Sequence, residues 1–177
     1  RRVLFRSFSH MAVMYANALY RRGFVQEGWK ALKTLADTAL DFDTSRIYPG
    51  IPEYFRADGR GMYHYLTGAA SWYMMTMITQ VFGVRGEAGD LLLQPKLTAA
   101  QFDAEGSASV HVTFAGRRLE IRCQNPGRLE YGQYRVQKVL CGDAELCAGS
   151  CDSVIIPRRV IEALPAEQKQ VFTVYLG

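Results

Sequence analysis

The chain has 177 residues and carries 21 Lys and Arg against 17 Asp and Glu. Hydrophobic residues make up 49% and charged residues 21%, which is ordinary for a globular protein and argues against a disordered segment, a collagen-like repeat and a coiled coil. The apolar runs are far shorter than the roughly 20 residues of a membrane-spanning helix. We therefore expect no membrane anchor and no membrane partner.

The first seven residues, Arg-Arg-Val-Leu-Phe-Arg-Ser, contain three of the arginines and no initiator Met. They resemble one reading frame of a common sequencing adapter. We therefore expect residues 1–7 to be a non-native scar and the native chain to be truncated before about Phe8. Without them the balance is 18 basic against 17 acidic residues, and so small an excess predicts no nucleic-acid partner.

The N-terminal half has helical periodicity. Apolar residues recur from Met11 at positions i, i+3, i+4 and i+7, which predicts a helix that ends near Gly23. The same spacing predicts a second helix over 25–40. Residues 41–65 form an irregular stretch rich in Gly, Pro and Asp, and loops of this length are often functional. Residues 68–82 are apolar almost all round, which is typical of a helix buried on most sides.

The C-terminal half instead shows short alternating runs separated by turn residues, which predicts antiparallel strands. These runs are 91–93, 110–114, 119–123, 134–140, 153–156 and 171–176. All four cysteines fall in this half, and their spacing matches no usual zinc motif, so we expect free thiols and no metal. His111 lies within an alternating run, and we expect it to be structural.

The start of the 68–82 helix is a candidate anion site. The first N–H groups of a helix have no internal partner and lie at the positive end of its dipole. Thr67 adds a hydroxyl donor, and Gly68 allows a ligand to approach the backbone. From periodicity alone, an N-cap role for Thr67 and a core or capping role for His10 are the simpler explanations. His64, between two tyrosines, either lines a sugar-stacking surface or has only a structural packing role.

Several motifs point to a known family. Ile-Pro-Glu-Tyr-Phe, Gly-Arg-Gly, Tyr-Leu-Thr-Gly-Ala-Ala-Ser-Trp and Phe-Gly-Val-Arg-Gly-Glu lie between Arg46 and Leu97. With Phe-Ser-His-Met-Ala-Val-Met-Tyr around His10, they resemble the cellobiose and β-glucan phosphorylases of glycoside hydrolase family 94. The resemblance covers essentially all of 8–177. It implies an α+β chain in two parts: residues 8–89 as the last helices of an (α/α)6 barrel, and residues 90–177 as a small antiparallel β-sandwich.

The resemblance also implies an activity. Such enzymes cleave a β-glucosidic bond of an oligosaccharide with inorganic phosphate and invert the anomeric centre, which yields α-glucose 1-phosphate. The resemblance assigns His10, Thr67 and Gly68 as phosphate ligands, and it makes Tyr63 a possible sugar-facing residue beside His64. The general acid, an Asp, is expected upstream, so we expect no catalytic residue in this chain and no activity from it alone.

The expected partners are a β-glucan oligosaccharide and phosphate, with no cofactor, in the cytoplasm. A homodimer of the full-length protein stays open. Two other interpretations also stay open: the phosphorylase-like tail of a membrane-bound cyclic β-glucan synthase, and a non-catalytic carbohydrate-binding module. The upstream sequence would separate the synthase from the phosphorylase, while the apolar helix and its Thr-Gly start argue against the binding module. The β-linkage that is cleaved does not follow from these residues.

Overall fold

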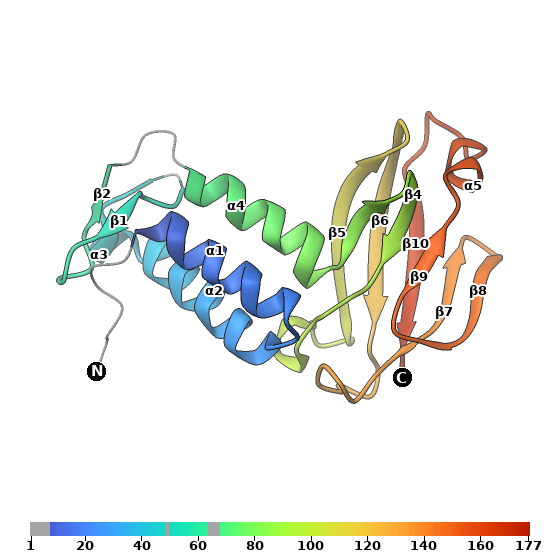
Figure 1. The fold of residues 1–177 in the computed structure, drawn as a ribbon, viewed down its shortest axis with the longest axis horizontal. Helices are drawn as coiled ribbons and strands as arrows, with labels where there is room; N and C mark the ends of the chain where they lie inside the picture. The colour runs from blue at the N-terminus through green and yellow to red at the C-terminus, as the bar shows by residue number, and fades with distance from the viewer. Residues whose placement is uncertain (1–7, 49, 64–67) are drawn as a thin grey trace. The chain divides into compact units, whose positions relative to one another are not determined.

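A computed structural model describes residues 8–48, 50–63 and 68–177 (Figure 1). Within these ranges the chain forms five short α-helices and ten strands in three sheets, so it is mostly β. It divides into two compact units between Met77 and Ile78. Among the described residues, none of the helices combines the length and the apolar composition that a bilayer crossing requires.

The N-terminal unit contains three main helices, a short helix and a two-stranded ribbon. Its elements are α1 (Ser9–Arg21), α2 (Val25–Leu40), α3 (Phe42–Ser45), β1 (Tyr54–Phe55), β2 (Gly61–Met62) and α4 (Gly68–Thr76). Gly23 adopts φ 84° in the turn between α1 and α2, which favours glycine because that conformation crowds a Cβ. The predicted helix over 25–40 is confirmed.

Two buried contacts join the helices of this unit. The Asn17 side-chain amide on α1 donates a hydrogen bond of 3.0 Å to the Thr76 hydroxyl on α4. At Gly28 on α2, an added Cβ would lie 2.6 Å from the Tyr20 ring, so the absent side chain makes room for that ring. The buried Asn17 amide is thus satisfied by a hydroxyl on the facing helix, and the Tyr20 ring fits against the facing helix because Gly28 has no side chain.

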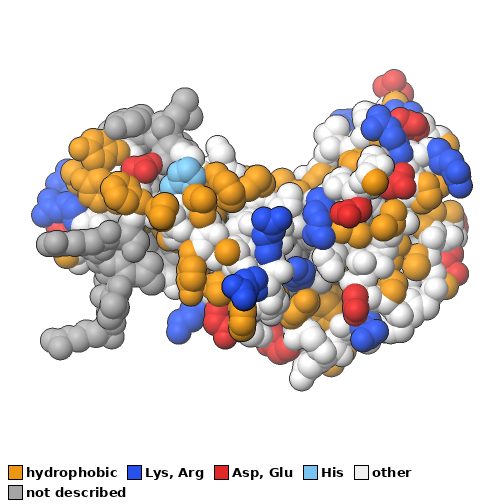
Figure 2. Space-filling view, in the orientation of Figure 1, with side chains coloured by type: hydrophobic (Ala, Val, Ile, Leu, Met, Phe, Trp, Pro, Cys, Tyr) orange, Lys and Arg blue, Asp and Glu red, His pale blue; other side chains and the backbone are white. Residues whose placement is uncertain are grey.

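The expectation that this part forms the last helices of an (α/α)6 barrel is wrong. The described helices are few and short, and they form no ring of helix pairs. The helix expected over 68–82 ends at Thr76 and continues as the π-helix η1 (Met77–Val81). Its apolar surface is not enclosed on most sides, because Met74 is 61% exposed. Hydrophobic side chains gather on the visible surface of the helices in Figure 2.

The C-terminal unit is formed by two sheets with the strand orders β5-β6-β10-β7-β8 and β3-β4-β9. Its elements are β3 (Val84–Glu87), β4 (Asp90–Leu93), the 3-10 helix η2 (Ala99–Gln101), β5 (Ser107–Phe114), β6 (Arg117–Gln124), β7 (Val136–Cys141), β8 (Ala144–Cys151), β9 (Val154–Ile156), α5 (Arg158–Glu162) and β10 (Gln170–Leu176).

The larger sheet is not purely antiparallel, which corrects the second half of the expected fold. β10 lies between β6 and β7, and it runs parallel to β6 and antiparallel to β7. β3 was not expected as a strand; it pairs with β4 and belongs to this unit. Local alternation identifies strands, but it carries no information on which neighbour each strand chooses.

Alternation along the strands of the larger sheet creates one apolar face and one polar face. The fully buried side chains on its apolar face include Leu119, Ile121 and Phe172. An added Cβ at Gly86 of β3 would lie 3.8 Å from the Phe114 ring of β5, so the two sheets are in contact there. The core of the unit therefore lies between the sheets, and the polar face of the larger sheet points outward.

Candidate anion site at the start of helix α4

His10 lies in the first turn of α1, and its imidazole packs on Gly68, the first residue of α4. A Cβ at position 68 would lie 2.6 Å from Cε1, 2.8 Å from Nδ1 and 2.9 Å from Nε2 of His10. Real Cβ atoms do not approach other atoms so closely, so this placement of the ring depends on glycine. The contact joins two segments that are far apart in the sequence.

The backbone just before His10 is held by the loop region that follows α3. The Ser9 N–H donates a hydrogen bond of 2.7 Å to the Glu53 carbonyl. Phe8 forms an isolated β-bridge with Tyr54. These bonds fix the entry to α1, and with it the direction in which the imidazole leaves the helix.

The electrostatics at the start of α4 favour an anion. The helix has nine residues, and the positive end of its dipole lies at Gly68. His10 Nε2 is buried without a hydrogen-bond partner among the described residues. The Trp72 ring, one turn into α4, lies 5.9 Å from the His10 ring between centroids. An unpartnered ring nitrogen thus lies at the positive end of a helix, beside an aromatic side chain.

The structure therefore brings together two of the three residues assigned to phosphate, His10 and Gly68. Thr67 and His64 lie outside the described residues. Tyr63 is half-exposed and adopts φ 57°, a left-handed conformation that is uncommon for a tyrosine. Its ring lies 5.4 Å from that of Tyr54.

An aromatic row next to His10 was not predicted. The Tyr54 ring lies 5.4 Å from that of Tyr63 and 6.0 Å from that of Phe8 between ring centroids, and we call these three residues the aromatic row. Phe8, at one end of this row, is two residues before His10 in the sequence. Tyr54 and Tyr63 stand in the irregular stretch of the sequence, but the pairing of β1 with β2 and the bridge from Phe8 to Tyr54 are what bring the three rings together.

A second polar cluster, also not predicted, occupies the C-terminal unit. The Glu120 side chain on β6 is only 6% exposed. Its Oε1 accepts hydrogen bonds from Arg122 at 3.0 and 2.5 Å, and its Oε2 accepts one from Lys169 and lies 3.4 Å from His111 Nε2. The bonds from Lys169 and Arg122 lower the pKa of Glu120 to about 2. His111 is therefore an exposed member of an ionic cluster.

No protein-family model matches the sequence, and no curated protein matches it. Within the described ranges, no three His, Cys, Asp or Glu side chains are grouped so that they could hold a metal ion. The geometry around His10 and Gly68 is thus the observation from which a function can be argued.

Proposed function

We propose that this chain supplies the phosphate-binding side of an inverting β-glucoside phosphorylase. The observation that carries the proposal is the contact between the His10 imidazole and Gly68 at the start of α4. A shared phosphate requires these two distant residues to meet, whereas separate capping roles place no constraint on their separation. The motif resemblance supports the same assignment and adds the hydroxyl of Thr67.

The reaction balances without a second catalytic carboxylate. A phosphate oxygen attacks the anomeric carbon from the face opposite the leaving group, the C1–O glycosidic bond breaks, and a general acid protonates the leaving oxygen. The products are α-glucose 1-phosphate and a glucan shortened by one unit. In this proposal the general acid is an Asp upstream of His10, and this chain alone is inactive.

The proposed task of the chain is to hold phosphate in line with the anomeric carbon. His10 donates a hydrogen bond from its imidazole, and the first N–H groups of α4 donate from the backbone. Because these donors are fixed before the reaction, they offset the negative charge of the phosphate beside the oxocarbenium-like centre without reorganisation. The aromatic row of Phe8, Tyr54 and Tyr63 is a candidate wall for the β-glucan, and we place the enzyme in the cytoplasm.

The test is phosphorolysis by the full-length protein that carries this chain. β-1,2-, β-1,3- and β-1,4-linked glucose oligosaccharides are incubated with phosphate, and the anomeric proton of the product is followed by NMR. We expect α-glucose 1-phosphate from one of the linkages. His10→Ala and Thr67→Val should raise KM for phosphate about 10- to 150-fold, with a smaller effect on the sugar. Release of free glucose without a need for phosphate would refute the proposal.

A further inference from the structure

The polar face of the five-stranded sheet carries several basic side chains around β5 and β6. His111 and Thr113 of β5 are directly opposite Glu120 and Arg118 of β6. Residues opposite one another in an antiparallel pair point to the same side of the sheet. Lys169, immediately before β10, reaches the same side, because its ammonium group binds the Glu120 carboxylate.

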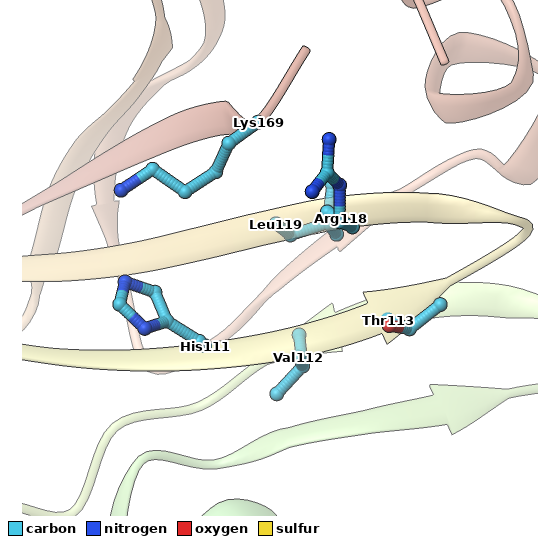
Figure 3. Close-up of a pocket in the computed structure, with 6 residues that line it drawn as sticks. All are labelled: His111, Val112, Thr113, Arg118, Leu119 and Lys169. Atoms are coloured by element: carbon cyan, nitrogen blue, oxygen red, sulfur yellow. The ribbon is translucent and has the colours of Figure 1, made fainter. Parts of the chain in front are cut away.

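These side chains surround a hollow of about 370 Å³ on this face (Figure 3). The lining residues are His111, Val112, Thr113, Arg118, Leu119 and Lys169. In Figure 3 the ammonium end of Lys169 lies on the same side of the hollow as the His111 ring, while the guanidinium of Arg118 rises from β6. A volume of this size is at the lower end of the range for small-molecule sites.

Positive charge exceeds negative charge around the hollow. Arg118 and Lys169 line the hollow, and the Glu120 carboxylate is shared by Lys169 and Arg122. Arg118 uses Nη2 to donate to the Glu167 carbonyl at 2.9 Å, which fixes the direction of a group with five donors. Lys169 gives one of its three donors to Glu120. Arg118 is therefore held by a neutral carbonyl and keeps its full charge, while Lys169 shares one carboxylate with Arg122.

We propose that this hollow binds the phosphate monoester of a small organic molecule. Arginine, lysine, histidine and a threonine hydroxyl are the donors that phosphate oxygens accept best. The hollow is larger than a bare phosphate ion, and the methylene stems of Lys169 and Arg118 offer apolar contact to an attached organic group. The site belongs to the C-terminal unit and shares no residue with the His10 site, so it does not depend on the proposed function.

The test is isothermal titration calorimetry of the chain with glucose 6-phosphate, which is not a product of the proposed phosphorolysis. Glucose serves as the neutral comparison and inorganic phosphate as the anion alone. We expect saturable binding of glucose 6-phosphate that weakens with added salt, weaker binding of phosphate and none of glucose. The double variant Arg118→Gln/Lys169→Gln should lose at least about tenfold in affinity.

Two further variants separate this site from its alternatives. Lys138→Gln removes one positive charge from β7 of the same sheet, away from the hollow, and should leave the affinity within about twofold. His10→Ala should also leave it unchanged. Equal losses in Lys138→Gln and in the double variant would show a diffuse charge effect and overturn the proposal, as would loss in His10→Ala alone or no saturable binding.

Discussion

The imidazole of His10 occupies the space that a side chain at position 68 would need. An added Cβ would lie within 2.9 Å of three atoms of the ring. Gly68→Ala therefore forces either the ring or the start of α4 to move, at a cost of about 1–3 kcal/mol in the free energy of unfolding. Chemical denaturation measures this cost, and titration with phosphate reports whether the ring has left the helix terminus.

The same relationship predicts a strong coupling between the two positions. Once His10→Ala has removed the ring, Gly68→Ala should be neutral or stabilising by up to about 1 kcal/mol, because alanine is the better helix former. Gly86→Ala is the matched control, since its Cβ would meet only an ordinary contact at 3.8 Å. Equal costs of Gly68→Ala in both backgrounds would show that the ring does not occupy this space.

The Glu120 cluster predicts a specific dependence of stability on acid. The folded-state pKa of about 2 lies below the ordinary value near 4.5, so the unfolded chain takes up the proton first as the pH falls. The stabilisation is fully present above about pH 4.5 and is lost as the pH approaches 2. Urea denaturation between pH 6 and about 2 should show a shallower decline for Glu120→Gln than for the unmodified protein. Parallel curves would contradict this account.

The buried hydroxyl of Tyr134 should contribute to stability through its hydrogen bonds, independently of the packing of its ring. The Leu97 N–H donates to the Tyr134 hydroxyl at 2.7 Å, and the hydroxyl donates to the Leu97 carbonyl at 2.9 Å. Tyr134→Phe leaves that N–H without its acceptor in the core and should cost about 1–3 kcal/mol in thermal or chemical unfolding. Tyr175→Phe is the control, because the contact of Tyr175 with Lys138 is made by the ring.

The four cysteines should differ in reactivity. All four are free thiols, and only Cys123 is fully buried. Burial raises the pKa of the Cys123 thiol to about 12, and a thiol rather than a thiolate reacts slowly. After a short pulse of iodoacetamide near pH 8, mass spectrometry should find Cys123 unmodified in the folded protein and modified in denaturant. Rapid labelling of Cys123 without denaturant would show that the sheet opens locally.

The sequence was sufficient to predict those helices and strands that a local pattern of apolar residues determines. The spacing of Val25, Trp29 and Leu32 predicted α2, and the alternation around His111 and Leu119 predicted β5 and β6 as strands. The approach of His10 to Gly68 was implied by the family resemblance, which assigns both residues to one phosphate, and not by periodicity.

The remaining differences involve choices that no local pattern encodes. The apolar residues of 68–82 predicted a surrounded helix, but hydrophobicity does not show whether neighbours are available, and Met74 is exposed. The Glu120 cluster needed the register that places His111 opposite Glu120 and the arrival of Lys169 from the segment before β10, far along the chain. Its only local sign was the alternation of charge from Arg118 to Arg122.

The strand order β5-β6-β10-β7-β8 has a consequence for synthesis. The β5–β6 and β7–β8 hairpins meet only through β10, which is the last of these strands to leave the ribosome. A two-stranded hairpin is at best marginally stable in water, so both hairpins remain incomplete while Gln170–Leu176 is still within the exit tunnel. Assembly of this sheet therefore waits for its central strand, and a ribosome paused before that point would hold two hairpins that no strand joins.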